Sequence, residues 1–509
     1  MTRQLHKSFL PLGLLIIVLA ACNIIEKGES TTEFVLKYTR EVSHVAITGR
    51  AVILLSKDTL VDPDIPNPYR PFITIGCDFK DWKPGKELVI DNDNSTGFLT
   101  TVEELEGSYS VRVLVDLDTT SCNLMQNGLC YSDNDVVHVG KENYDVVELT
   151  VNNVLDVFDF QESEFVRLFE VKSSMLSQFY NSETRIEAEV VLPESYYEDS
   201  LRIYPTVFVF PGWGTTHVTA SQDDFQQKRY GASGYGEEKI FVIMNQDSRY
   251  GYHVFADSEN NGPRASSFVM EFIPEFEMNF RAISDPRARF MVGQSSGAWA
   301  SLWLAVNYPD TFGMLWAGSP DPVSFSDFVG HNLYADDANL FYDEQGNLTS
   351  AIRLADLQFT NMDWSEMESA LGEGGQYQSF EAVFGHKDTD GKPEQLFDRV
   401  TGRIFLKALE NWKNYDINRL IISNSQSLKS SLSGKINITV ADNDDFFLDG
   451  SVKLLKQTLD SLKIDSNVIL LSDGGHDAWS DEIRSTMHKR MDSISSGIVI
   501  RFNTPCHPD

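Results

Sequence analysis

The sequence predicts a two-domain protein in which an α/β domain with a doubly wound, mostly parallel sheet follows an all-β, sandwich-like domain. The chain has 509 residues, which is more than a single hydrophobic core usually serves. Its residues are 42% hydrophobic, which is enough to fill two packed cores. Near residue 165 the apolar pattern changes from short alternating runs to strands that alternate with helices.

Residues 32–164 carry the pattern of antiparallel strands. Apolar and polar residues alternate in SHVAITGRAVILLS, SYSVRVLVDLD and YDVVELTVNNV, and Gly, Pro, Asp and Asn separate such runs. Trp82 and Tyr131 could line a carbohydrate-binding surface, but packing in the core or between the domains is the favoured interpretation.

Residues 165–509 are predicted to form the α/β domain. Its buried-strand runs are PTVFVFPG (205–212), KIFVIMN (239–245), RFMVG (289–293), FGMLWAGSP (312–320), KINITVAD (435–442) and NVILLSDGG (467–475). Helical spacing of apolar residues between them, as in SVKLLKQTLDSL, favours a parallel sheet covered by helices. Residues 321–434 interrupt this alternation, and we expect them to form a cap or large insertion over the carboxyl edge of the sheet.

The N-terminus has the features of an export signal. Arg3 and Lys7 precede an apolar run that is short for a membrane span, so residues 1–21 are predicted to be a signal peptide. The run ends in LAAC, which resembles a bacterial lipobox, and Cys22 would then carry a lipid anchor followed by a polar tether over residues 22–31. An ordinary signal peptide with an incidental cysteine is the alternative. Lipidation would place the protein in the cell envelope, on a membrane leaflet that the sequence does not identify.

Composition limits the partners and cofactors. The formal net charge of −33 repels phosphate backbones and argues against nucleic acid as a partner. Cys122 and Cys130 are close enough in sequence to form a disulfide in an oxidising compartment. Cys77 and Cys506 could also pair, although nothing in the sequence brings them together. The cysteines and histidines lack the spacing of a structural zinc site, and no metal is predicted.

The segment FMVGQSSGAWASLWLAVNYP contains a G-x-S-x-G pattern with Ser295 at its centre. The pattern lies between a buried strand and a helix that opens with small residues, which is the context of a sharp strand-to-helix turn. Such a turn exposes the central side chain on top of the sheet, so Ser295 is the predicted nucleophile. The backbone N–H of Ser296 is predicted to contribute to an oxyanion hole at the positive end of the helix.

A nucleophilic serine needs an acid and a base, and in enzymes with such a turn they follow the serine in that order. His476 directly follows a predicted strand and is the predicted base. The other histidines after Ser295 lie in the insertion, in a charged helical stretch or in the tail: His331, His386, His488 and His507.

The acid is expected after the preceding strand, where ITVADNDDFFLDGSVKLL offers Asp442, Asp444 and Asp445. Spacing does not choose among these three, and the cluster could also cap the next helix or hold a cation. The second half of the oxyanion hole is expected in VFVFPGWGTTH, where the N–H of Trp213 is the preferred donor and its ring could also roof the pocket.

Taken together, these segments resemble the esterase family of α/β-hydrolases that includes esterase D, enterochelin esterases and feruloyl esterases. The similar residues are spread over about 165–490, in YPTVFVFPG, HVFADSENNGP, GQSSGAWASLWLAVNYPDTFG, SPDPVSFSDF and ADNDDFFLDGSVKLL. The resemblance is greatest to bacterial members with an extra N-terminal β domain. It implies an α/β-hydrolase fold, and it implies Asp444 as the acid, because the family's aspartate stands two residues before the aromatic of this motif.

The chain departs from the family pattern near the nucleophile and the acid. Gln294 replaces a histidine, and Ala298 and Ala441 replace glycines. These changes leave the three triad groups in place, and they bear on the shape of the pocket and the rate.

The sequence therefore predicts an exported serine esterase that needs no cofactor. Ser295 would attack the acyl carbon, His476 would take its proton, and Asp444 would orient His476. A peptidase or transacylase on the same fold is one alternative, and a catalytically idle lipoprotein that binds glycans or a partner is another. The substrate would be an ester on a small molecule or a polysaccharide; feruloyl, acetyl, siderophore and short-chain esters stay open, and the oligomeric state is not predicted.

Overall fold

The computed structural model describes residues 32–117, 120–122, 128–140, 145–155, 160, 162–215, 217, 229–232, 234–353, 358–496 and 498. The predicted signal peptide, Cys22, the tether and Cys506 lie outside these residues. Within the described ranges, no helix has both the length and the apolar character that crossing a membrane requires.

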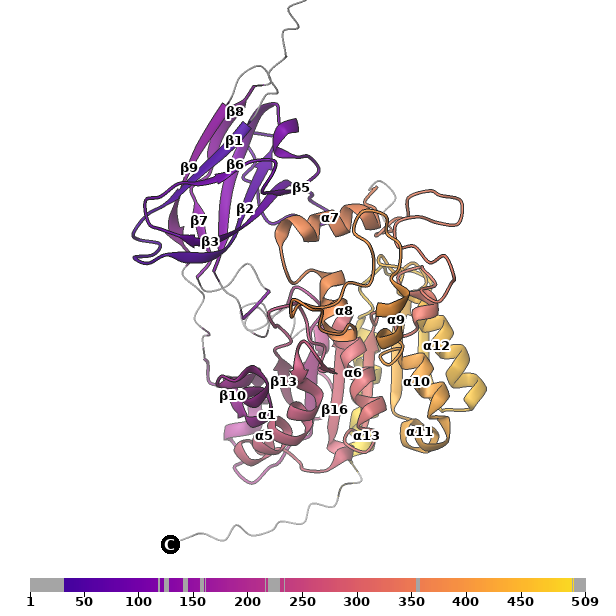
Figure 1. The fold of residues 1–509 in the computed structure, drawn as a ribbon. Helices are drawn as coiled ribbons and strands as arrows, with labels where there is room; N and C mark the ends of the chain where they lie inside the picture. Colours follow the sequence, from indigo (N-terminus) through magenta and orange to yellow (C-terminus); the bar gives the residue numbers. More distant parts are fainter. Residues whose placement is uncertain are drawn as a thin grey trace, which may run out of the picture.

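The N-terminal domain forms, over its described residues, a nine-stranded sheet that curls around its own core (Figure 1). The strands are β1 (Thr32–Tyr38), β2 (Ile47–Ser56), β3 (Ile73–Trp82), β4 (Leu88–Ile90), β5 (Thr96–Phe98), β6 (Gly107–Asp116), β7 (Cys130–Ser132), β8 (Asp135–Val139) and β9 (Asp145–Val154), with a helical turn at Val102–Glu104. Their order is β4-β1-β9-β7-β6-β2-β3-β5, and β8 pairs with β6.

The two ends of this sheet face each other across the core. Tyr38 in β1 and Trp82 in β3 are far apart in the strand order, yet their ring centroids lie 4.7 Å apart. The Tyr38 hydroxyl also donates a hydrogen bond to the Trp82 carbonyl. The sandwich-like shape thus comes from one continuous sheet, and Trp82 packs in the core of the domain.

The C-terminal domain is built on a sheet that has eight strands among the described residues. They are β10 (Val166–Ser173), β11 (Thr184–Val191), β12 (Thr206–Phe210), β13 (Ile240–Met244), β16 (Arg289–Gln294), β17 (Met314–Gly318), β18 (Ile436–Ala441) and β19 (Ser466–Leu471), in the order β10-β11-β13-β12-β16-β17-β18-β19. From β13 onward all neighbours pair in parallel, whereas β10, β11 and β13 pair antiparallel. The six predicted buried runs coincide with β12, β13 and β16 to β19.

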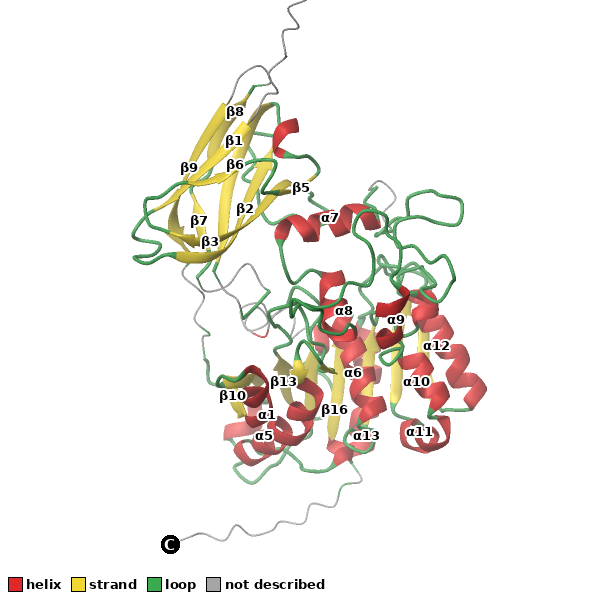
Figure 2. Cartoon of the chain, viewed as in Figure 1, coloured by secondary structure: helices red, strands yellow, loops and turns green. Residues whose placement is uncertain are grey.

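Helices cover both faces of this sheet, and this arrangement confirms the predicted α/β-hydrolase fold (Figure 2). One face packs against α5 (Ile273–Asn279), α6 (Ser296–Asn307) and α12 (Asp449–Leu462), and the other packs against α13 (Asp481–Ser495). Smaller elements are α1 (Ser174–Tyr180), α4 (Arg264–Ser267), the π-helical turn Phe268–Phe272, the short pair β14 (Asp257–Ser258) and β15 (Gly262–Pro263), and turns at Glu194–Tyr197, Pro286–Ala288 and Phe325–Asp327.

The segment between β17 and β18 divides into two parts. Helices α10 (Ile417–Ser423) and α11 (Ser425–Leu432) contact α6 beside the sheet. Helices α7 (Asn361–Leu371) and α8 (Gln376–Phe384) lie above the carboxyl ends of the strands, next to α9 (Leu406–Trp412) (Figure 1). The part of the segment that covers the sheet edge is therefore formed by α7 and α8, which we call the cap helices.

The N-terminal domain contacts cap helix α7. The guanidinium of Arg50 in β2 donates hydrogen bonds to the carbonyls of Ser369 and Ala370 in the last turn of α7, at 2.8 Å and 3.0 Å. Phe98 in β5 packs edge-to-face on Phe359, just before α7, with ring centroids 6.1 Å apart. One face of the cap is thus held by the β domain.

The predicted disulfide between Cys122 and Cys130 is wrong, because both thiols are free. The Cys130 thiol donates to the Gly128 carbonyl inside the β domain, whereas the Cys122 thiol donates to Asp247 of the α/β domain at 2.9 Å. The two thiols thus have partners in different domains, and their closeness in sequence does not make them a disulfide. Cys77 is also free and is buried in β3.

Candidate active site

The turn from β16 into α6 places Ser295 in a strained backbone conformation, with φ 56° and ψ −121°. Two glycines make the turn possible: a Cβ on Gly293 would overlap the Gly297 carbonyl, and a Cβ on Gly297 would overlap the Phe210 carbonyl. The Ser295 side chain therefore projects above the sheet into a pocket. Ser296 occupies the first turn of α6, where backbone N–H groups have no acceptor within the helix.

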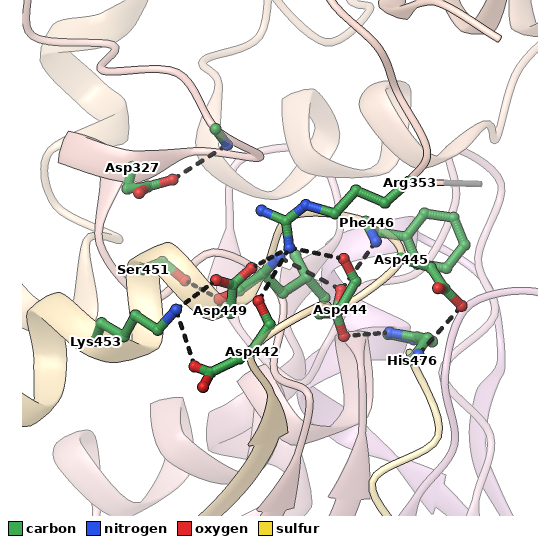
Figure 3. Close-up of polar contacts among 12 residues, drawn as sticks. Asp327, Arg353, Asp442, Asp444, Asp445, Phe446, Asp449, Ser451, Lys453 and His476 are labelled. Carbon is green, nitrogen blue, oxygen red and sulfur yellow. Dashed lines mark hydrogen bonds and ion pairs between the residues drawn. The ribbon is translucent and has the colours of Figure 1, made fainter. Parts of the chain in front are cut away.

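His476 follows β19, and its ring lies beside the carboxylate of Asp444 (Figure 3). The Nδ1 atom of His476 donates to Oδ2 of Asp444 at 3.0 Å. Asp444 is fully buried, and its other oxygen accepts from the backbone N–H groups of Phe446 and Leu448. The bond from His476 Nδ1 to Asp444 fixes the tautomer of the imidazole, because it leaves Nε2 as the atom able to accept a proton.

The three carboxylates after β18 have different partners, as Figure 3 shows. Asp445 accepts from the backbone N–H of His476 at 3.1 Å and so holds the loop that carries the ring. Asp442 pairs with Lys453 of α12, with 3.0 Å between the charged atoms. Of the three, Asp444 is the one that contacts the imidazole ring, which agrees with the choice that the family resemblance implied.

The loop after β12 approaches the nucleophile from the other side. A Cβ on Gly212 would lie 3.4 Å from the Cβ of Ser295, so the backbone of this loop packs next to the nucleophile turn. The indole N–H of Trp213 donates to the Gly374 carbonyl in the loop between the cap helices, at 3.3 Å. Trp213 therefore links the predicted oxyanion loop to the cap and lines the pocket.

The Ser295 hydroxyl donates to Asp321 in this structure. The Ser295 Oγ atom lies 3.1 Å from Oδ1 of Asp321, and the Ser296 Oγ atom lies 2.6 Å from Oδ2. Gln376 of α8 donates to the same carboxylate at 3.1 Å. Burial raises the pKa of Asp321 to about 6, against the lowering effect of the bonds from Ser296 and Ser295.

These groups line one pocket of about 210 Å³. Ser295, Asp321, Gln294, Arg229 and His476 are polar groups in its wall. The apolar part of the lining comes from the cap helices and from loops on both sides of the sheet edge: Val329, Ala351, Trp364, Tyr377, Phe380, Phe446 and Leu448. A small, mostly apolar pocket of this kind suits the uncharged acyl or alcohol part of a small ester.

Gln294, which replaces the family's histidine, joins the nucleophile turn to the loop of the base. Its side-chain amide donates to the His476 carbonyl at 2.8 Å and accepts from the Trp479 indole at 2.7 Å. Ala298 is fully buried in α6. Both departures therefore fit into the packing around the site.

The other histidines have partners elsewhere. Nε2 of His331 faces Asn361 at 3.2 Å, His386 pairs with Glu259 at 2.8 Å, and His488 is buried against Tyr230. Among the described residues, His476 is the histidine that lines the pocket, and His507 lies outside them.

Sequence reasoning missed Asp321 and the pocket residues of the cap. Asp321 follows β17 at the same sheet edge as the other site residues, so its position after a buried strand was a usable signal. Trp364, Gln376 and Tyr377 carry no motif, and only the path of the cap helices brings them to Ser295.

A family model described as "Putative esterase" matches residues 181–477, more than half of the chain. The chain belongs to this esterase family. Membership supports ester hydrolysis as its chemistry. No curated protein sequence matches the chain.

Several solved structures resemble this esterase. A ferulic acid esterase is 17% identical, with a TM-score of 0.40 over 66% of this chain and 99% of the other. The serine hydrolase FphF of Staphylococcus aureus, described as fluorophosphonate-binding, is 12% identical, with a TM-score of 0.40 over 64% and 98%. An S-formylglutathione hydrolase from Agrobacterium tumefaciens is 15% identical, with a TM-score of 0.38 over 66% and 96%.

Proposed function

We propose that this esterase is a serine hydrolase that cleaves carboxylic esters through an acyl-enzyme, with Ser295, His476 and Asp444 as its triad. The observation that carries the proposal is the 3.0 Å bond from His476 Nδ1 to the buried carboxylate of Asp444, in the pocket into which the strained Ser295 turn projects. A histidine with its Nδ1 so occupied presents Nε2 to the pocket, as a general base requires.

The proposed reaction has two halves. Oγ of Ser295 forms a bond to the acyl carbon while His476 takes the hydroxyl proton, and the oxyanion accepts hydrogen bonds from the backbone N–H groups of Ser296 and Trp213. The C–O bond to the alcohol then breaks, and His476 gives its proton to the leaving oxygen. Water repeats these steps on the acyl-enzyme and releases the acid and Ser295.

The test combines covalent labelling with turnover. The wild-type chain should react with a fluorophosphonate probe and hydrolyse p-nitrophenyl acetate, and Ser295→Ala should lose the labelling and at least about a thousandfold of the turnover. Ser301→Ala is the matched control, since this buried serine of α6 donates to the Gly297 carbonyl outside the pocket. Labelling of Ser295→Ala equal to the wild type, or an unreactive wild type, would refute the proposal and favour an idle scaffold.

The proposal includes export and attachment to a membrane through a lipid on Cys22. It is supported by the basic residues, the apolar run and the LAAC sequence at the N-terminus. In a bacterial host the full chain should incorporate labelled palmitate and sediment with membranes, and Cys22→Ala should do neither. Equal incorporation into both proteins would rule out Cys22 as the anchor.

The ester substrate can be narrowed by a panel. Acetyl, butyryl, feruloyl and siderophore esters differ mainly in the size and polarity of the acyl group, and the pocket of about 210 Å³ limits how much of that group can be buried. Values of kcat/KM across the panel would rank these classes, and a peptide or acyl-acceptor substrate that outperforms every ester would favour the peptidase or transacylase alternative.

A further inference from the structure

Asp321 is placed against the nucleophile by the backbone. Its N–H donates to the Ser295 carbonyl at 3.2 Å, and the chain reaches this point through Ser319, whose φ is 41°. The Asp321 side chain is only 4% exposed and points into the wall of the pocket. A carboxylate in such a position must be satisfied by neighbouring donors.

Those donors include the two serines of the nucleophile turn. Ser295 donates to one oxygen of the Asp321 carboxylate, and Ser296 and Gln376 donate to the other. A hydroxyl carries a single proton, so the Ser295 hydroxyl cannot donate to Asp321 and to His476 at the same time. The orientation in this structure is therefore one in which the proton of the nucleophile is held away from the base.

We infer that Asp321 is a positioning residue that holds the Ser295 hydroxyl in a resting orientation, from which it must be released before His476 can take its proton. The inference rests on the proposed triad and adds Asp321 as an acceptor that competes with His476 for the hydrogen bond of the Ser295 hydroxyl. A bound substrate can release the hydroxyl, because Gln376 begins cap helix α8 and both it and the next residue, Tyr377, line the pocket.

The strength of the hydrogen bond from the Ser295 hydroxyl to Asp321 depends on pH, because Asp321 can ionise. A charged carboxylate is a stronger acceptor than a protonated carboxyl group, and burial raises the pKa of Asp321 to about 6. His476 is the titratable group that acts on Asp321 from the loop after β19, and its positive form lowers the Asp321 pKa. The side chains that donate to Asp321 are those of Ser295, Ser296 and Gln376, and all three are neutral. A charged side chain, that of Arg229, lines the same pocket. As pH rises through about 6, Asp321 therefore ionises and binds the Ser295 hydroxyl more tightly.

The test is the rate of reaction with a fluorophosphonate probe in the absence of substrate. In this reaction Ser295 Oγ bonds to phosphorus, fluoride leaves, and the serine proton passes to His476, so the rate reports how often Ser295 faces the base. Asp321→Asn removes the charged acceptor and keeps the size of the side chain. We expect the probe to label Asp321→Asn about tenfold faster than the wild type near pH 8. Near pH 5 the two rates should differ by less than about twofold.

Asp416→Asn is the matched control, because Asp416 is equally buried but caps α10 outside the pocket. It should label as the wild type does at every pH. A ratio of Asp321→Asn to wild type that is one or below, or that does not change with pH, overturns the inference. If Asp321→Asn does not fold, the wild-type pH profile of labelling decides: the inference requires the ionisation of Asp321 to produce a break in the profile near pH 6, and a profile without one overturns it.

The two proposals fail in different ways. If Ser295→Ala loses all labelling while Asp321→Asn matches the wild type, the triad stands and the role of Asp321 falls. If Ser295→Ala still labels, the nucleophile is misassigned and both fall.

Discussion

At the scale of single residues, the proposed site contains two neighbouring aspartates with different roles, and their substitution should change kcat by different amounts. Asp444 contacts the His476 ring, whereas Asp445 contacts only its backbone N–H. Asp444→Asn should lower kcat about a thousandfold to ten-thousandfold, because an amide in this position favours the wrong imidazole tautomer. Asp445→Asn should cost about tenfold or less, since it loosens the loop and leaves the tautomer intact. Steady-state hydrolysis of p-nitrophenyl acetate would show the difference, and equal losses would contradict the assignment of Asp444.

Gln294 supports a second residue-scale prediction. Because it bonds both the His476 carbonyl and the Trp479 indole, Gln294→Ala should let the His476 loop move and should lower kcat about tenfold with little change in KM. Trp479→Phe breaks one of the two bonds and should lower kcat by less. A rise in KM without a fall in kcat would mean that Gln294 binds substrate directly.

The order of motifs along the chain was enough to predict Ser295 and His476 as members of one site, whereas the choice of Asp444 came from the family resemblance. Ser295, Asp444 and His476 each follow a strand of the parallel part of the sheet, and the carboxyl ends of such strands meet at one edge. The resting contact of Ser295 with Asp321 was not predictable, because it depends on a side-chain rotamer and on the turn at Ser319. Similarly, the separation in sequence between Cys122 and Cys130 gave no information about the domain in which each thiol finds its partner.

At the scale of elements, the strands were the easiest part of the fold to predict. Continuous apolar runs such as 240–244 have few alternatives to a strand buried on both faces, and β13 is fully buried over Ile240–Met244. The sequence did not predict which parts of 321–434 lie beside the sheet and which lie above it. Helices α10 and α11 beside the sheet have a mixed composition similar to that of the cap helices above it. What distinguishes them is the surface on which they pack.

The contact of the β domain with α7 predicts a role in holding the pocket. Arg50 places its positive charge at the carboxyl end of α7, where the helix carbonyls lack internal partners. Arg50→Ala should speed amide hydrogen exchange in α7 about tenfold and should lower kcat/KM, because Trp364 of this helix lines the pocket. Asp78→Ala is the control, since it removes an exposed partner of Arg50 and leaves the helix contact intact. Unchanged exchange in α7 after Arg50→Ala would show that the cap does not depend on the β domain.

A buried acid at the junction of the cap helices predicts a pH-dependent stability. Glu368 of α7 accepts from the Trp364 indole and the Tyr377 backbone N–H, and burial raises its pKa from 4.5 to about 7. Between these values the folded state binds more protons than the unfolded state, so the Glu368 contribution to the free energy of unfolding falls as pH rises. Glu368→Gln does not titrate, and its free energy of unfolding relative to wild type should increase by about 2–3 kcal/mol from about pH 4.5 to about pH 8.

Urea denaturation at the two pH values would measure this difference. Glu344→Gln, in an exposed loop, should show a difference from wild type that does not change with pH. If Glu368→Gln behaved in the same way, Glu368 would have to be ionised at no cost in the folded protein.

At the scale of the whole molecule, charge opposes the compact state. The chain has 75 acidic and 42 basic residues, so repulsion among the excess carboxylates is spread over the surface of both domains. Many of the ion pairs are exposed, as between Lys172 and Glu183 or Arg249 and Glu373, and pairs of this kind contribute little to stability. Screening by salt should therefore relieve more repulsion than it removes attraction.

This balance predicts that salt stabilises the protein. Raising NaCl from about 20 mM to about 0.5 M shortens the screening length to roughly 4 Å and should raise Tm by roughly 2 to 4 °C near pH 8. Because sodium chloride screens charge with little preferential exclusion, a sucrose series serves as the control for solvent effects unrelated to charge. Near the sequence pI of about 4.6 the excess negative charge disappears, and the same salt step should leave Tm unchanged or lower it. A Tm that falls with salt near pH 8 would mean that specific ion pairs, such as the buried pair of Lys239 and Asp492, outweigh the net repulsion.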